Sequence, residues 1–289
     1  MLYKIKTFAK INLSLLVYRP RSKDGYHPIC SVFQNISLFD ELKIKILKNQ
    51  PGYFKLSCNH PDVPLNSENI LSKIYFKLKK DIPFGLDIHI QKNIPLGGGL
   101  GGGSSNAAAF LAFLNQYVPL NYSLKKLQNI GLKFGADIPF FLVGGTALVR
   151  GIGEKIRSLK PGTQKYFLVF NPGLHLNTQK IYQAFDAFTE NFLYPAKTPK
   201  RILQGKIGPN SLQSVVFAQY PLFRDIEQQL QQLGAQVYMT GSGATLFIPF
   251  KQLKACHLFQ AQLQEIYPDK FMCTVKTVDK SYRSPFIKV

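Results

Sequence analysis

Apolar and polar side chains alternate over residues 5–17, near the start of the chain. Apolar residues and Thr7 occupy the odd-numbered positions from Ile5 to Val17, and Lys10 and Asn12 are among the polar residues between them. A period of two predicts a half-buried strand, because successive side chains of a strand point to opposite faces. Lys10 and Asn12 should therefore lie side by side on the polar face of this strand.

The pattern predicts two groups of strands and helices, separated near residues 160–162. In the first group we expect strands at 30–38, 41–48 and 86–91, a strand pair within 144–156, and helices at 69–78, 107–117 and 124–134. Ser67 is the expected cap of the first of these helices. In the second group we expect strands at 166–170, 236–240, 244–250 and 272–278, and helices at 178–188, 212–219, 222–233 and 253–266. The chain should thus form two α+β domains of unequal size, residues 1–159 and 160–289.

Composition indicates a folded protein with a strong positive charge. Hydrophobic residues make up 45% of the 289 and charged residues 18%, which is typical of a globular chain, while the net charge is +20. The basic residues are spread thinly from Lys4 to Lys288. A diffuse field of this kind suits small polyanions as well as polynucleotides, so we expect no specific nucleic acid partner. Because no apolar run approaches the ~20 residues of a membrane span, we expect no membrane partner and a cytoplasmic location.

Cysteine and histidine spacings carry no metal motif. Four cysteines lie far apart without a C-x-x-C pair, and the five histidines form neither H-x-x-x-H nor H-E-x-x-H. The cysteines predict buried free thiols in a reducing cytosol rather than a disulfide framework or a zinc site. No metal ligand can be assigned from this spacing.

A glycine-rich loop at residues 97–103 is the sharpest local signal. Six glycines lie there between the predicted strand 86–91 and the predicted helix 107–117. Glycine lets backbone N–H groups approach a ligand closely, and a helix beginning just beyond adds its positive dipole end, so phosphate is the ligand that suits this loop best. The alternative is a flexible connector.

The loop does not match the two commonest nucleotide motifs. No Lys-Ser or Lys-Thr follows its last glycine, as a Walker loop would require. Gly97, Gly99 and Gly102 satisfy G-x-G-x-x-G formally, but the acidic residue expected ~20 positions later in a dinucleotide fold is missing. The loop therefore predicts phosphate binding of another kind.

Asp137 is the only acidic residue between Asp87 and Glu154. A solitary carboxylate in a basic, glycine-rich neighbourhood is a candidate for accepting a proton or binding a metal. It also precedes Pro139, so the alternative, which composition alone favours, is a helix cap. Lys10 is open to the same two interpretations, since a lone lysine on a strand usually only lays its aliphatic stem on apolar surface.

Five segments together resemble the GHMP kinase superfamily, in the family's order across nearly the whole chain. They are Ala-Lys-Ile-Asn-Leu at 9–13, Asp-Gly-Tyr-His at 24–27, the loop at 95–106, Gly-Ala-Asp-Ile-Pro-Phe-Phe at 135–141 and Thr-Gly-Ser-Gly at 240–243. The resemblance implies a two-domain fold. Its N-terminal mixed α/β domain would carry the glycine-rich phosphate loop, and its C-terminal α/β domain would be ferredoxin-like.

Within the superfamily, Asp-Gly-Tyr-His beside Ala-Lys-Ile-Asn is similar to one kinase of non-mevalonate isoprenoid precursor synthesis. This resemblance implies transfer of the ATP γ-phosphate to the 2-hydroxyl of a cytidine-diphosphate-linked methylerythritol. ATP would be the co-substrate, Mg²⁺ would assist, and the protein would be a monomer or a homodimer.

The resemblance also implies roles for individual residues. Asp137 would be the base and Lys10 its partner, with Asn69 and Lys92 near the adenosine. The ATP phosphates would be held by Pro95, Leu96, Gly97, Gly98, Gly99, Leu100, Gly101, Gly102, Gly103, Ser104 and Ser105. Around the acceptor would lie Tyr26, His27 and Tyr182 at the cytosine, Asn12 near the polyol, and Thr178, Gly241 and Ser242.

Two segments depart from the family pattern. Thr240 stands where the family more often has serine, a change that keeps the hydroxyl. Asn-Ser-Leu-Gln at 210–213 stands where the family often shows Asn-Asp-Leu-Glu, so two carboxylates are lost there. Alternative functions are another GHMP small-molecule kinase, of the mevalonate or homoserine type, and a basic nucleic-acid-binding protein. The Tyr26–His27 pair argues against the first, and only the net charge favours the second.

Overall fold

The computed structural model describes residues 1–18, 26–163, 165–174, 176–187, 206–279 and 287–288. Asp24 and Gly25 of the segment 24–27, and the expected helix end at Phe188, lie outside these residues. Within the described part, none of the helices is long and apolar enough to cross a membrane.

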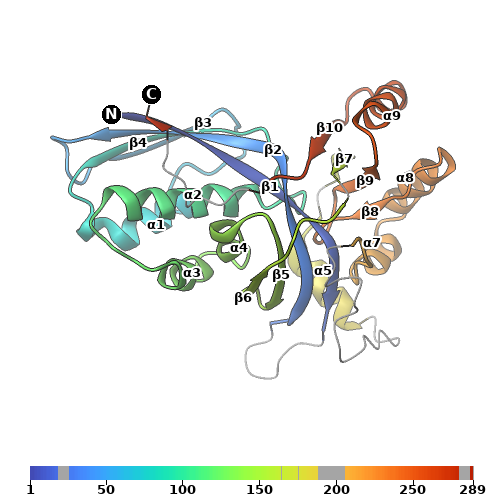
Figure 1. The fold of residues 1–289 in the computed structure, drawn as a ribbon, viewed down its shortest axis with the longest axis horizontal. Coiled ribbons are helices and arrows are strands. Elements are labelled where there is room, and N and C mark those ends of the chain that lie inside the picture. The colour runs from blue at the N-terminus through green and yellow to red at the C-terminus, as the bar shows by residue number, and fades with distance from the viewer. Residues whose placement is uncertain (19–25, 164, 175, 188–205, 280–286, 289) are drawn as a thin grey trace.

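The larger sheet contains seven strands and is built on a long antiparallel pair, β1 and β2 (Figure 1). Its members are β1 (Leu2–Val17), β2 (Ile29–Leu47), β3 (Phe54–Cys58), β4 (Gly85–Gln91), β5 (Thr146–Gly151), β6 (Lys155–Ser158) and β11 (Ile287–Lys288). The central order is β11-β1-β2-β4-β3, and β5 pairs with β2 and β6. The strand expected at 5–17 is confirmed as part of β1, but the expectation that it is half-buried is wrong, because residues 9–17 are buried on both faces. The strand pair expected within 144–156 is confirmed as β5 and β6, although β6 extends to Ser158.

The expectation of two strands at 30–38 and 41–48 is wrong, because β2 is continuous. Phe39 and Asp40 stay paired with Phe8 and Thr7 of β1, so the chain does not leave the sheet between the two halves. The first half of β2 pairs with β5 and the second half with β4. Sequence reasoning also missed β3, a five-residue strand that lies parallel to β4.

Helices α1 (Ile70–Leu78), α2 (Gly102–Tyr117), α3 (Leu124–Leu132) and α4 (Ile138–Val143) lie together on one side of this sheet (Figure 1). They bury a large apolar core in which Phe110 and Phe113 of α2 are fully enclosed. The cap of α1 is Asn69 and not Ser67, because the Asn69 side chain accepts a hydrogen bond from Leu71 N at 2.9 Å. Helix α2 begins at Gly102, so the last glycines of the loop already belong to its first turn.

The smaller sheet has the strand order β10-β7-β9-β8, with all pairs antiparallel. Its strands are β7 (Tyr166–Asn171), β8 (Tyr238–Met239), β9 (Leu246–Phe250) and β10 (Phe271–Lys276). Helices α5 (Thr178–Ala187), α7 (Gln213–Gln219) and α8 (Pro221–Gln232) join β7 to β8, and α9 (Leu253–Ile266) joins β9 to β10. Numbered along the chain, the order is fourth, first, third, second, which confirms the ferredoxin-like arrangement.

The two sheets divide the chain between β6 and β7, while β11 returns to the larger sheet beside β1. The lower end of β1 also packs into the second core, where Leu15 and Val17 lie among the residues of the smaller sheet. A boundary at residues 159 and 160 stays a prediction. The end of β1 thus lies where residues from both halves of the chain meet.

Candidate active site

Lys10 and Asp137 are brought together from different elements, β1 and the turn before α4. Lys10 Nζ lies 3.5 Å from Asp137 Oδ2, and the lysine side chain is 4% exposed against 31% for the aspartate. Nζ also lies 4.7 Å from the centre of the Phe33 ring, within the range of a cation–π contact. Asp137 occupies the N-cap position of α4, yet its side chain makes no capping hydrogen bond to that fully described helix. Its carboxylate is therefore available beside an ammonium group at the edge of a cavity.

Asn12 is the neighbour that holds Lys10 in place. Its Oδ1 accepts hydrogen bonds from Lys10 Nζ at 2.8 Å, Gly241 N at 2.9 Å and Thr240 Oγ1 at 3.1 Å. Its Nδ2 donates to Ser31 Oγ at 2.9 Å. An amide oxygen has two lone pairs, so three donors occupy it fully. The predicted contact of Asn12 with a polyol stays a prediction, whereas its contact with the loop at 240–243 is direct.

The glycine loop packs closely against both of these groups. Gly97, Gly99 and Gly101 have φ values of 67°, 71° and 70°, which side chains strongly disfavour. A Cβ on Gly99 would lie 2.6 Å from the Thr240 carbonyl oxygen, and one on Gly101 would lie 2.8 Å from the Phe141 ring and 3.3 Å from Lys10 Cε. The glycine loop therefore packs between Lys10 and the loop at 240–243, and it is not a flexible connector.

A cavity of about 810 Å³ opens beside Lys10 and Asp137. The predicted site residues on its wall are Lys10, Tyr26, His27, Gly99, Ser104, Asp137, Thr178, Tyr182, Gly241 and Ser242. Thr178 and Ser242 hydroxyls are hydrogen-bonded to each other at 2.8 Å. Ser105 lies elsewhere, because it is fully buried and donates a hydrogen bond to Phe8 O at 2.7 Å. Asn12 lines a different cavity, beside Asn210.

Aromatic side chains gather at one end of this larger cavity. The His27 ring centre lies 5.1 Å from that of Tyr182, and His27 Nε2 lies 2.7 Å from Asp186 Oδ1. Burial, and then the negative charge of Asp137, raise the pKa of Tyr182 to about 12. Tyr26 is 62% exposed at the rim. Sequence reasoning missed Asp186, although it follows Tyr182 by four residues on one helix and so shares its face.

A smaller cavity of about 190 Å³ lies on the other side of the glycine loop. Asn69, Lys92, Leu96, Gly103 and Asn106 are on its wall. Since Gly99 and Ser104 line the larger cavity, the loop separates the two. This arrangement can hold a nucleoside in the smaller cavity, its phosphates along the loop, and an acceptor in the larger one.

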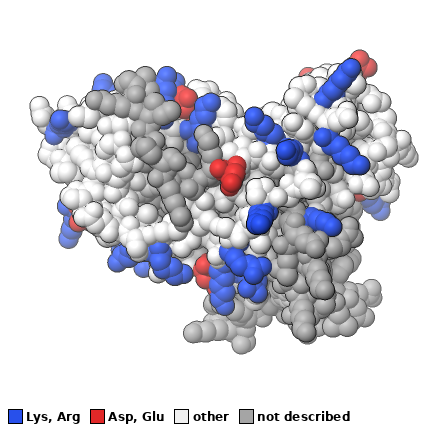
Figure 2. Space-filling model, viewed as in Figure 1, with Lys and Arg blue, Asp and Glu red and all other residues white. Residues whose placement is uncertain are grey.

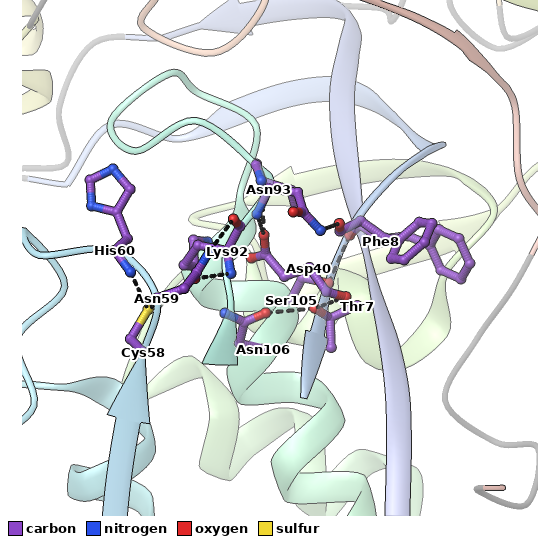
Figure 3. A network of polar contacts seen from close by, with 12 residues as sticks. Thr7, Phe8, Asp40, Cys58, Asn59, His60, Lys92, Asn93, Ser105 and Asn106 are labelled. Carbon is purple, nitrogen blue, oxygen red and sulfur yellow. Dashed lines mark hydrogen bonds and ion pairs between the residues drawn. The ribbon is translucent and has the colours of Figure 1, made fainter. Parts of the chain in front are cut away.

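No three His, Cys, Asp or Glu residues of the described part lie close enough together to hold a metal ion. Asp40, which sequence reasoning also missed, forms a buried ion pair with Lys92 (Figure 3). Asp62 and Glu68 are further carboxylates on the wall of the smaller cavity.

The sequence profile of the GHMP kinases N terminal domain matches residues 69–145, and that of the GHMP kinases C terminal matches residues 198–269. Fold and profiles together define a GHMP kinase, an ATP-dependent phosphotransferase. The chain is 37% identical to a 4-diphosphocytidyl-2-C-methyl-D-erythritol kinase of Clostridium botulinum (strain Eklund 17B / Type B), over 93% of this chain and 98% of that one. It belongs to the family of these kinases.

Other matches agree with this family. A kinase of the same name from Alkaliphilus oremlandii (strain OhILAs) is 37% identical, over 93% of this chain and 94% of the relative. A crystal structure of 4-(cytidine 5'-diphospho)-2C-methyl-D-erythritol kinase has a TM-score of 0.74 at 29% identity, covering 94% of this chain and 99% of that one. A homoserine kinase from Cytophaga hutchinsonii has a TM-score of 0.71 at 16% identity, over 97% and 96% of the two chains, and shows likeness of fold alone.

Proposed function

We propose that this protein transfers the γ-phosphate of ATP to the 2-hydroxyl of 4-diphosphocytidyl-2-C-methyl-D-erythritol. The observation that carries the proposal is the Lys10–Asp137 pair, 3.5 Å apart at the wall of a cavity that also contains the glycine loop and the His27–Tyr182 pair. Phosphoryl transfer requires chiefly positioning and neutralisation of charge. The three features supply these at one place.

Asp137 accepts the proton of the acceptor hydroxyl during phosphoryl transfer. The hydroxyl oxygen attacks the γ-phosphorus, the bond from that phosphorus to the bridging oxygen breaks, and ADP leaves with the electron pair. Lys10, fixed by Asn12, faces the negative charge as it moves between the oxygens. Backbone N–H groups of the glycine loop and the first turn of α2 hold the remaining phosphates.

Mg²⁺ belongs to the proposal as well. This ion usually binds one or two carboxylates together with substrate phosphates and does not need a cage of protein ligands. Asp137 and the Ser104 hydroxyl, both on the wall of the larger cavity, are the described groups that would contact it beside the phosphates. When bound, it would neutralise phosphate charge.

A panel of alcohols tests the proposed function. Purified protein is incubated with ATP and Mg²⁺ and with the cytidine-diphosphate-linked substrate, mevalonate or homoserine, and ADP release is followed. We expect release only with the first alcohol. Release with mevalonate or homoserine alone would assign the protein to another group of GHMP kinases, and the absence of release with all three would contradict the proposal.

The cytosine end makes a prediction about substrate affinity. Replacing both Tyr26 and His27 with alanine should raise the KM for the cytidine substrate by about tenfold or more, since stacking on an aromatic side chain contributes about 1–3 kcal/mol per base in comparable sites. The KM for ATP, whose nucleoside is assigned to the other cavity, should change by less than about twofold. Equal changes in the two KM values would remove both residues from the cytosine site.

The hydroxyl of Thr240 makes a prediction about Lys10. Thr240 Oγ1 donates to Asn12 Oδ1 and accepts from Asn12 N at 2.9 Å. Thr240→Val removes both bonds from a buried site, where such a loss costs about 1–3 kcal/mol, and should lower kcat about tenfold through a displaced lysine. Thr240→Ser keeps the hydroxyl and is the matched control, with kcat near that of the wild type. Equal rates for the two variants would contradict this role.

Two further proposals concern the whole chain. We place the boundary between the domains at residues 159 and 160, supported by the restart of the strand and helix pattern there. We also place the protein in the cytoplasm, supported by its need for ATP and by four cysteines that are free thiols.

Lys and Arg side chains lie in separate groups on the face shown in Figure 2, which favours a small polyanion over a nucleic acid as the partner.

A further inference from the structure

Asp40 is a charged group that the proposed chemistry leaves without a role. It lies within β2 with an exposed fraction of 0%. A carboxylate in such surroundings is costly unless it is paired and hydrogen-bonded. Its Oδ2 contacts Lys92 Nζ, and its Oδ1 accepts hydrogen bonds from Asn93 N and Ile94 N, both at 2.8 Å (Figure 3). Three donors from one segment thus converge on this carboxylate.

That segment, residues 92–94, joins β4 to the glycine loop. Lys92 is held by its backbone as well, because its N–H donates to Asn59 Oδ1 at 2.7 Å and its carbonyl oxygen accepts from Asn59 Nδ2 at 3.3 Å. Asn59 therefore holds the backbone of Lys92, and Asp40 of β2 holds its side chain and the two residues that follow.

The Lys92 ammonium lies against the beginning of α2. A Cβ on Gly102, the first residue of that helix, would be 2.9 Å from Lys92 Nζ and 3.2 Å from Ile94 Cβ. The same ammonium is on the wall of the smaller cavity, together with Asn69 and Gly103. Lys92 is only 8% exposed, and its ammonium faces the positive end of the helix dipole. A positive charge in this place is unfavourable unless a negative charge is paired with it.

A second set of bonds links the helix to β1, and β1 to Asp40 of β2. Thr7 Oγ1 donates to Asn106 Oδ1 at 2.6 Å and lies 3.1 Å from the Asp40 carbonyl oxygen. Ser105 Oγ donates to Phe8 O at 2.7 Å. The strand that carries Asp40 and the helix that follows the loop are thus joined near Lys92 (Figure 3).

We propose that Asp40 is a positioning residue for the nucleotide. It neutralises Lys92 and fixes that ammonium and the entrance of the glycine loop, so that the smaller cavity presents Lys92 to the nucleoside side of ATP. An ammonium has three N–H donors, and the contact with Asp40 requires only one of them. This assignment rests on the proposed function, because it takes the smaller cavity as part of the ATP site.

The test is direct binding of a non-hydrolysable ATP analogue, adenylyl imidodiphosphate with Mg²⁺, measured by calorimetry on the full chain. Asp40→Asn keeps an oxygen for the two backbone N–H groups, but removes the charge and replaces the oxygen that faces Lys92 with an NH2 group, which cannot accept a hydrogen bond. We expect it and Lys92→Met each to weaken analogue binding about tenfold or more, and to leave the KM for the acceptor within about twofold. Glu41→Gln, a neighbouring carboxylate at 3.9 Å from Lys43 Nζ, is the matched control and should bind like the wild type.

A double variant separates positioning from stability. If Asp40→Asn fails to fold, because it leaves Lys92 buried without a partner, Asp40→Asn combined with Lys92→Met removes both charges. Asp40 acts through Lys92, so this double variant should melt above Lys92→Met and bind the analogue within about twofold of it. Wild-type affinity in Asp40→Asn or in Lys92→Met would overturn the inference, as would a restored affinity in the double variant. Failure of the wild-type protein to bind the analogue would instead contradict the proposed function.

Discussion

Replacing Asp137 with asparagine should lower kcat by about 10²–10⁴-fold, the usual contribution of a general base. Asparagine has nearly the same shape, so the cavity wall and the position of α4 are preserved, but it cannot take the proton of the acceptor hydroxyl. Because ground-state binding does not require that transfer, and the amide oxygen of asparagine can still contact Mg²⁺, both KM values should change by less than about twofold. Steady-state rates, measured after thermal melting has shown that the variant is folded, test this expectation.

The control is Asp225→Asn, which changes an exposed carboxylate on α8, and it should leave kcat unchanged. The transition state of phosphoryl transfer is often loose, with the proton moving late, and this places the expected loss toward the lower end of the range. Near-full kcat in Asp137→Asn would show that the carboxylate is not the base.

Lys10→Met should lower kcat by about 10²–10³-fold, the cost of removing one donor that faces developing charge. Methionine can keep the apolar contact with Phe33, and Asn12 Oδ1 still accepts from Thr240 and Gly241, so the loop at 240–243 should stay in place. The change removes the positive charge 3.5 Å from Asp137 Oδ2. We therefore expect Lys10→Met to change kcat more than it changes the KM for ATP or the KM for the acceptor.

Lys6 offers a matched control on the same strand. Its Nζ lies 4.5 Å from the centre of the Phe39 ring, a contact like that of Lys10 with Phe33, but its side chain is exposed and is not part of the cavity wall described above. Lys6→Met should have kcat close to the wild-type value. Similar rates for the two lysine variants would show that Lys10 contributes only packing.

Elements with a strong local pattern were predictable from the sequence. Residues 253–266 form a helix with the expected bounds, and residues 5–17 are a strand with Lys10 and Asn12 near each other. The glycine loop was predictable as well, because positive φ and close packing demand glycine at each of its turns. These features depend on neighbours in the sequence.

Other features depend on partners far along the chain and gave no local signal. Asp40 lies between the two strands expected at 30–38 and 41–48, where β2 is continuous. It is buried there because Lys92, 52 residues later, neutralises it. Asn12 Oδ1 accepts hydrogen bonds from Thr240 and Gly241, which lie 228 and 229 residues later in the chain. A serine pair in the loop gave no sign that Ser105 would face the sheet while Ser104 faces the cavity.

The most direct test of the proposed reaction is the identity of its product. The purified protein is incubated with ATP, Mg²⁺ and the cytidine-diphosphate-linked methylerythritol, and the mixture is followed by phosphorus NMR without proton decoupling. The account predicts one new phosphomonoester signal that grows in step with ADP and is not split by protons, because carbon 2 carries a methyl group and no hydrogen. Free phosphate in place of that signal, or a phosphomonoester split by the protons of carbon 1 or carbon 3, would contradict it.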